Sequence, residues 1–147
     1  MPEDPDFTIP LGEAVVRRQG RDVTVVAYIG MVHCAMAAAK ELEKDSISVE
    51  IVDPRTLRPM DEQTIVSSVR KTHRAVVVES GVGFAGLDSE IAAFIAEQAF
   101  DDLDAPVERV TGADAPMPYA QNLEHLKTPT QEKIVAAVRR VCYATRR

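Results

Sequence analysis

Runs of apolar, β-branched residues alternate along this chain with segments of helical periodicity, and this alternation constrains the fold most strongly. Strands are expected at residues 23–29, 49–53, 75–79 and 107–110. Their nearly continuous apolar character is typical of strands covered on both faces. The pattern therefore predicts an α/β fold: a three-layer sandwich with a mostly parallel sheet of about five strands, one antiparallel edge strand, and helices on both faces.

Helical segments occupy the stretches between these strands. Apolar residues recur at helical spacing in residues 33–44 and again in residues 88–100. A third helix is expected to begin after Asp61, because the oxygen of an aspartate side chain can accept a backbone N–H of the first helical turn. The buried face of that helix is expected to consist of Ile65, Val66 and Val69.

The last helix has the clearest start signal. Thr128 can cap it, Pro129 has the preset φ of a first helical position, and Gln131 completes a capping box with Thr128. The residues between the fourth strand and this helix are expected to form a long loop that passes through Gly112, Pro116 and Pro118.

The start of the chain predicts an edge strand and an arm. Residues 13–17, followed by a turn at Gln19 and Gly20, are expected to run antiparallel into the first parallel strand. Residues 1–8 predict a flexible N-terminal arm. Residues 9–147 then form a single domain, since a chain of 147 residues fits one core.

Charge and hydropathy exclude two classes of partner. The formal net charge is −6, so the chain lacks the basic field that would gather nucleic-acid phosphates. Its apolar runs are shorter than the roughly 18 residues that a membrane span needs. We expect a cytoplasmic protein, with the mitochondrial matrix left open, and we interpret Cys34 and Cys142 as reduced thiols, with a long-range disulfide as the alternative.

Residues 81–86 form a G-x-G-x-x-G motif between a strand and a helix. In dinucleotide-binding domains this motif follows the first strand, and an acidic residue ends the next strand. Here it follows the third strand, and the fourth strand ends in Val110, Thr111 and Gly112. The motif therefore favours a tight turn with close packing of strand and helix. A free-standing module that binds a nucleotide or an anion is the alternative.

Four polar residues follow the strands and should share one edge of the sheet. His33 begins a helix there, where it could contact a ligand or a subunit, although a surface or capping role is the simpler interpretation. Glu79 could face Arg55 and Arg58 as a charge-assisted pair, which more simply ties loops together. Neither a nucleophile nor a paired general base accompanies these residues, so we assign no catalytic, cofactor-binding or metal-binding residue.

The segment Pro116, Met117, Pro118 and Tyr119 places large side chains on a backbone stiffened by two prolines. Such a segment suits a contact surface, because little conformational entropy remains to be lost on binding. A loop folded over its own core fits the same residues, and the sequence favours neither interpretation.

Several segments together, in this order, resemble the C-terminal domains of the transketolase superfamily. The resemblance is strongest to the beta subunits of thiamin-diphosphate-dependent 2-oxo acid dehydrogenases, and of the pyruvate dehydrogenase group in particular. The ordered set is more specific than any one segment. The resemblance lies in residues 9–12, 22–28, 31–33, 55–61, 105–112 and 116–120.

This resemblance implies that the chain is one domain of an enzyme subunit and is inactive alone. The parent would decarboxylate pyruvate oxidatively and transfer the acyl group to lipoyl-lysine, with a branched-chain 2-oxo acid or acetoin as alternative substrates. Thiamin diphosphate and magnesium would belong to other parts of the parent. The implied partners are the alpha subunit, a second beta subunit and the subunit-binding domain of the dihydrolipoyl acyltransferase.

The resemblance also implies which residues meet other subunits. Pro116, Met117, Pro118 and Tyr119 are the first candidates. His33 and Arg58 are the weaker ones.

Overall fold

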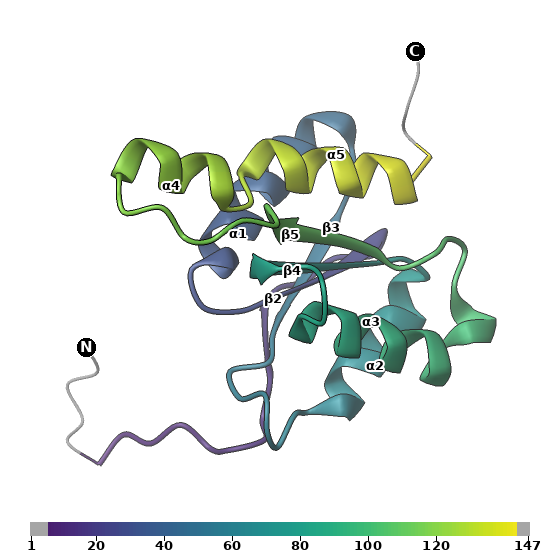
Figure 1. Cartoon of the computed structure of the whole chain (residues 1–147). Coiled ribbons are helices and arrows are strands. Elements are labelled where there is room, and N and C mark those ends of the chain that lie inside the picture. The colour runs from purple at the N-terminus through teal and green to yellow at the C-terminus, as the bar shows by residue number, and fades with distance from the viewer. Residues whose placement is uncertain (1–5, 144–147) are drawn as a thin grey trace.

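The computed structural model describes residues 6–143 of the chain. The expected arm at residues 1–8 therefore lies mostly outside the described residues, as do residues 144–147. The described part is a three-layer α/β sandwich around one five-stranded sheet with the order β1-β3-β2-β4-β5 (Figure 1). The predicted fold class is confirmed.

Four of the five strands run parallel. β2 pairs with both β3 and β4, and β4 pairs with β5, all in parallel register, whereas β1 pairs antiparallel with β3. The strands are β1 (Val15–Arg18), β2 (Val23–Ala27), β3 (Val49–Asp53), β4 (Ala75–Val82) and β5 (Glu108–Gly112).

Helices cover both faces of the sheet. Figure 1 shows α1 and α5 on one face and α2 and α3 on the other. The helices are α1 (Met31–Leu42), α2 (Glu62–Thr72), α3 (Leu87–Gln98), α4 (Gln121–Lys127) and α5 (Gln131–Val141), with short 3₁₀ turns η1 (Glu43–Asp45) and η2 (Phe100–Asp102).

The sheet separates two apolar clusters, because side chains alternate between the faces of a strand. Val25 of β2 packs in the cluster beneath α1 and α5, and its neighbour Val26 packs in the cluster beneath α2 and α3. Every residue of β2 is buried. This two-sided burial explains why β2 and the first half of β4 consist mostly of valine.

The edge strand pairs differently from the prediction. β1 lies against β3, with Val15 opposite Asp53 and Val16 opposite Val52, rather than against β2. β2 is central and both of its edges are already hydrogen-bonded, so the free edge of β3 is the available site. The chain passes so close to β3 at Gly20 that a Cβ there would overlap the backbone nitrogen of Glu50.

The segment before the last helix is not one long loop, because it contains α4. The backbone N–H of Thr128 closes that helix by donating to the carbonyl of Glu124 at 3.1 Å. Thr128 therefore ends α4 and cannot cap α5. The cap is Thr130, whose hydroxyl accepts the N–H of Lys133 at 3.5 Å, so the predicted start was wrong by two residues.

The buried face of α2 is partly polar, which the prediction missed. Val66 is half-buried, whereas Ser68 and Thr72 are buried. Their hydroxyls lie 2.8 and 2.7 Å from the hydroxyl of Thr24 on β2. Ser68 also donates to the carboxylate of Glu50 at 2.5 Å. This hydrogen-bonded network adds to the expected apolar contact of Ile65 and Val69, which are both buried.

Candidate functional site

The carboxyl ends of β2 to β5 meet at one edge of the sheet, where ligands and partners of parallel sheets usually bind. Large apolar side chains stand exposed in the loops at this edge and on α4. Ile29 is 81% exposed, Phe84 87% and Tyr119 107%. We call this set the carboxyl rim. It comprises Ile29, Leu57, Phe84, Met117, Tyr119, Leu123 and Leu126.

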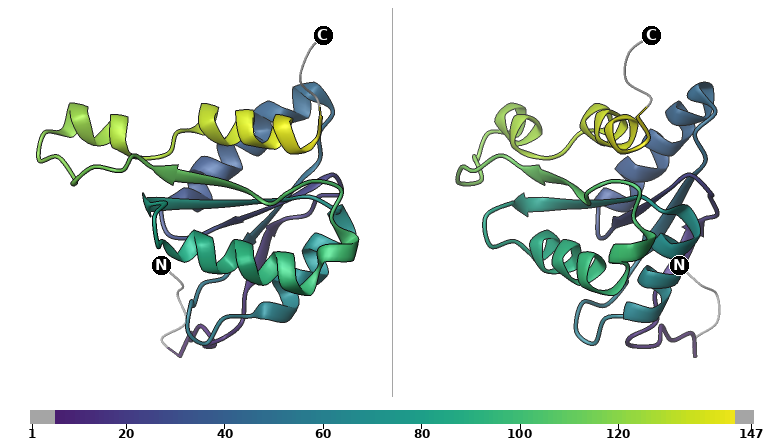
Figure 2. Two further views of the ribbon diagram at one scale, coloured as in Figure 1. Left: turned by 45° about the vertical axis from the view of Figure 1, so that its right-hand side comes forward. Right: turned by 90° about the vertical axis from the view of Figure 1, so that its right-hand side faces the viewer.

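The Pro116 to Tyr119 segment forms the outermost part of the rim. Figure 2 shows the β5–α4 connection projecting beyond the sheet. Pro116, Met117 and Tyr119 are exposed and Pro118 is half-buried, so the loop does not fold over its own core. Sequence reasoning identified this segment but missed Ile29 and Phe84. The sequence signal that could have identified Ile29 and Phe84 is an apolar residue next to a glycine just after a strand.

His33, Arg55 and Arg58 all lie at this edge, as predicted. His33 is exposed in the first turn of α1, and Arg58 is exposed in the loop after β3. The predicted pairing of Glu79 with Arg55 and Arg58 is wrong within the described residues. Arg55 lines a pocket between the ends of β2 and β3 instead.

The carboxylate of Glu79 is hydrogen-bonded to the first turn of α3. Its Oε2 accepts the backbone N–H of Asp88 at 2.8 Å. Burial raises the pKa of Glu79, and the neighbouring Asp88 carboxyl also acts to raise it, against the opposing effect of the Asp88 N–H. Burial also raises the pKa of Tyr28, and the charge of Glu79 adds to that shift.

Asp88 is fully buried and pairs with Arg109 of β5, which sequence reasoning did not find. Arg109 donates to Oδ2 of Asp88 at 2.8 Å and to the carbonyl of Gly83 at 3.0 Å. The two charged residues are 21 positions apart, on a helix and a strand of no common motif. Their pairing follows from the β4–β5 register, so the sequence carried no local signal for it.

The glycines of residues 83–86 serve close packing in a turn, in agreement with the favoured interpretation, but Gly81 lies inside β4, which runs three residues beyond its predicted end at residue 79. A Cβ on Gly86 would overlap Oδ1 of Asp88 and would lie 2.6 Å from the carbonyl oxygen of Val82. The Asp88 N–H, which would face an anion at the start of α3, already donates to Glu79. The geometry of this turn therefore does not favour a bound phosphate.

Two hollows flank the molecule. The Arg55 pocket, about 610 Å³, is lined by Ile9, Arg17, Ile29, Val32, His33, Met36, Asp53 and Arg55. The α3 groove, about 690 Å³, lies at the opposite, amino end of the strands and is lined by Ala92, Ala93, Ala96, Phe100, Asp101, Leu103, Asp104, Ala105, Pro106 and Val107.

Within residues 6–143, no three side chains of His, Cys, Asp or Glu gather closely enough to hold a metal ion. In the same part of the chain, no helix has the length and apolar character needed to cross a bilayer.

Cys34 and Cys142 are free and half-buried, so the predicted reduced thiols are observed and the alternative disulfide is not. Burial raises the pKa of the Cys142 thiol.

Known proteins share this sequence and architecture. The chain is 48% identical over 143 residues to the pyruvate dehydrogenase E1 component subunit beta-1, mitochondrial, of Arabidopsis thaliana, a match that covers 97% of this chain and 39% of the relative. It is 47% identical over 135 residues to the subunit beta of Rickettsia conorii, covering 92% of this chain and 41% of the relative. The chain thus spans less than half the length of these curated relatives.

The solved structure of a split gene transketolase, described as an inactive beta4 tetramer, has a TM-score of 0.76 and 30% sequence identity, covering 97% of this chain and 45% of that chain. The family described as "Transketolase, C-terminal domain" matches residues 12–134, which span all of the sheet and every helix up to the first turn of α5. The chain therefore belongs to the transketolase C-terminal domain family.

Proposed function

We propose that this chain is the C-terminal domain of a beta subunit of a pyruvate dehydrogenase, and that it serves subunit assembly. The carboxyl rim carries the proposal. Exposed apolar side chains from four loops and α4 gather at one edge, and such patches usually mark interaction surfaces. The beta-subunit relatives of well over twice this length support a larger parent.

The parent enzyme decarboxylates pyruvate oxidatively and transfers the acyl group to lipoyl-lysine. A branched-chain 2-oxo acid or acetoin is the alternative substrate. Thiamin diphosphate and magnesium belong to other parts of the parent, and the described residues gather no ligand cluster through which a metal-dependent step could be derived for this chain. In this proposal the isolated chain is inactive, because the parts of the parent that bind the cofactor lie outside it.

The proposed partners at the rim are the alpha subunit and the second beta subunit of a heterotetramer. Tyr119 and Met117 would insert into the neighbouring subunit, with His33 and Arg58 at the margin of the contact. Tyrosine suits this role because it buries a large area and loses few rotamers. The Tyr119 side chain is 107% exposed, so it contributes little packing to the folded domain and is available to a partner.

The α3 groove is the proposed docking surface for the subunit-binding domain of the dihydrolipoyl acyltransferase. It lies at the opposite end of the strands from the rim, so both surfaces can be engaged together. Ala93 is exposed on its wall. Ala93→Arg should block capture of the acyltransferase domain in a sedimentation assay while the heterotetramer still forms. Unchanged capture would remove this part of the proposal.

The assembly role is tested in the full beta subunit mixed with its alpha subunit. Tyr119→Ala should shift the sedimentation profile from tetramer toward smaller species. Tyr143→Ala is the matched control, because Tyr143 is 69% exposed and lies outside the rim. Tyr119→Ala should keep the thermal unfolding of the parent protein, and Tyr143→Ala should lower it slightly at most, because it removes one exposed hydrogen bond from the Tyr143 hydroxyl to the carbonyl of Asp104 at 3.1 Å. A tetramer that is equally stable in the Tyr119→Ala and Tyr143→Ala variants would refute the assembly role.

A calorimetric titration separates this proposal from the free-standing binding module. The isolated chain should bind neither thiamin diphosphate nor NAD, ATP or phosphate tightly. Submicromolar affinity for NAD or ATP would favour the nucleotide-binding alternative, and tight binding of thiamin diphosphate would contradict the division of roles proposed here.

We propose a cytoplasmic location, with the mitochondrial matrix as the alternative, since the relatives include mitochondrial and bacterial proteins.

A further inference from the structure

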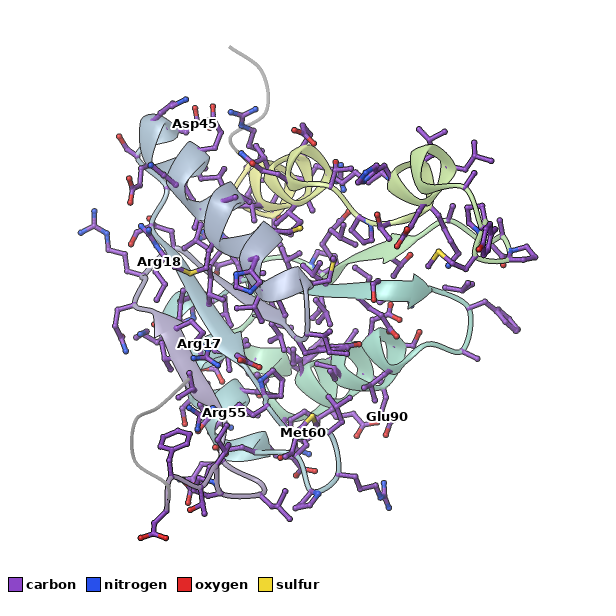
Figure 3. All side chains as sticks on the ribbon, turned by 90° about the vertical axis from the view of Figure 1, so that its left-hand side faces the viewer. Arg17, Arg18, Asp45, Arg55, Met60 and Glu90 are labelled. Carbon is purple, nitrogen blue, oxygen red and sulfur yellow. The ribbon has the colours of Figure 1, made fainter. Side chains whose placement is uncertain are left out.

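The Arg55 pocket holds a positive charge that the described residues leave unneutralised. Asp53, the carboxylate in its wall, accepts hydrogen bonds from Arg17 at 2.7 and 3.0 Å and from the backbone N–H of Arg55 at 3.0 Å. Both of its oxygens are therefore occupied. The Arg55 side chain has no hydrogen-bond partner within residues 6–143, and its Nε is buried. Figure 3 labels Arg17 and Arg55 on this side of the molecule.

The two terminal guanidinium nitrogens of Arg55 also lack a hydrogen-bond partner among residues 6–143, but they reach solvent, so they can donate to an oxygen of a ligand in the pocket. Two further features of the pocket favour an anion. α1 begins at the pocket wall with no capping side chain at Gly30 and no acidic residue in its first turn, so no carboxylate of that turn offsets the positive end of its dipole, although its first N–H groups donate to the carbonyls of residues 28–30. His33 in that turn lines the same pocket and offers an imidazole N–H.

The other walls define the remainder of the ligand. Ile9, Ile29, Val32 and Met36 form an apolar surface next to the cationic end. Asp53 offsets the charge of Arg17, so the pocket presents one net positive charge, and the nearby carboxylate disfavours a dianion. We propose that the Arg55 pocket binds a monocarboxylate with a short apolar chain, the carboxylate on Arg55 and the chain on Ile29, Val32 and Met36.

This site does not depend on the proposed subunit role. The carboxylate can come from a free small molecule or from an acidic side chain of a neighbouring subunit, and the chemistry of recognition is shared. The isolated chain presents the pocket in both cases. The assembled enzyme presents it only if a free small molecule is the natural occupant.

The test uses 4,4,4-trifluorobutyrate, followed by fluorine NMR, and butyrate, acetate and phosphate, followed by the backbone N–H signals of the labelled chain at constant ionic strength. Butyrate should give saturable shifts at residues 29–33 and 53–55 with a dissociation constant on the order of millimolar. Acetate should bind several-fold more weakly because it lacks the apolar chain, and phosphate should be the weakest because it carries the greater charge.

Arg55→Gln should weaken butyrate binding by about tenfold, the loss expected when a charge-assisted hydrogen bond is removed. Arg58→Gln is the matched control, since it removes the same charge from the same loop at an exposed position that does not line the pocket. Its affinity should change by less than about twofold, which is the scale of a screened surface charge. His33→Gln should produce an intermediate loss.

Trifluorobutyrate binding to both the isolated chain and the assembled enzyme identifies a small-molecule site. Binding to the isolated chain alone identifies a carboxylate from another subunit. The proposal is overturned by non-saturable shifts, by equal effects of Arg55→Gln and Arg58→Gln, or by phosphate binding more tightly than butyrate.

Discussion

The backbone N–H of Asp88 donates a 2.8 Å hydrogen bond to Oε2 of Glu79, so a carboxylate from within β4 holds the first turn of α3. A negative charge is favourable at a helix N-terminus, where N–H groups lack intrahelical partners. The same contact places Glu79 beside a second, fully buried carboxyl group. Helix capping and carboxylate repulsion therefore act on one side chain in opposite directions.

Glu79→Gln should stabilise the protein at neutral pH by about 0.5–1 kcal/mol. The amide keeps an acceptor for the Asp88 N–H and supplies a donor to Oδ1 of Asp88, which has no hydrogen-bond partner among the described residues. Because the pKa of Glu79 is raised in the fold, its protonated form contributes stability that is fully present below the ordinary pKa of 4.5. That contribution is lost as the pH rises through the folded-state pKa.

Urea unfolding of the parent and Glu79→Gln between pH 4 and 8 measures this difference. The advantage of the variant should grow with pH across that window. Glu90→Gln, which removes a carboxylate from an exposed position of the same helix, should show no such growth. Parallel stability curves for the parent and Glu79→Gln would argue against a raised pKa.

Arg109→Met should destabilise the domain by about 2–4 kcal/mol, because it leaves Asp88 buried without its cationic partner. The double variant Arg109→Met with Asp88→Asn should recover much of that loss. A double-mutant cycle in urea measures the coupling of the two residues. If the losses of the single variants simply add, the pair does not stabilise the β4–β5 end of the sheet as the geometry indicates.

Asp61→Ala should cost about 1–2 kcal/mol, since Asp61 caps α2 and also anchors the N-terminal segment. Its carboxylate accepts the N–H of Thr64 at 3.0 Å, the Thr64 hydroxyl at 2.7 Å and the N–H of Ala14 at 3.0 Å. Burial acts to raise the pKa of Asp61, but these hydrogen bonds outweigh it and lower the pKa.

The lowered pKa sets the pH dependence of this contribution. The stability from Asp61 is present above its ordinary pKa of 3.8 and is lost as the pH falls through the folded-state value. Asp61→Asn keeps a capping oxygen and should restore part of the loss at pH 7. Thermal unfolding at pH 2.5 and 7 should show a smaller difference between parent and Asp61→Ala at the lower pH. A constant difference would mean that the ionised carboxylate is not what stabilises the cap.

Ile29→Gly should stabilise the isolated domain by about 0.5–1 kcal/mol. Ile29 has a φ of +53°, a conformation that costs L-residues roughly 1–2 kcal/mol and that glycine adopts freely, at about 0.5–1 kcal/mol of added chain entropy. The side chain is 81% exposed, so little packing is lost. Ile29→Ala keeps the strain and should change the stability little. Differential scanning calorimetry of the Ile29→Gly and Ile29→Ala variants tests this prediction. Equal melting temperatures of the two variants would show that the backbone at Ile29 is unstrained.

The sequence by itself determined the layers and most of the elements. The alternation of apolar runs and helical periods predicted the parallel sheet, and the strand at residues 49–53 has the observed bounds. The apolar stripe of the last helix at Ile134, Val135, Val138 and Val141 is buried as its spacing requires. These features follow from local periodicity, which depends on near neighbours in the chain. The positions of His33, Arg55 and Arg58 at one edge follow from the same topology.

Only the tertiary structure decided the partners of particular residues. β1 joins β3 because β2 has no free edge, and that depends on the completed sheet. Glu79 meets Asp88 across the turn between β4 and α3 rather than an arginine. Arg109 reaches Asp88 from β5, because the pairing of β5 with β4 brings it there. Periodicity specifies which face of an element is buried. Which side chain of another element contacts that buried face depends on packing between distant segments, which local sequence does not encode.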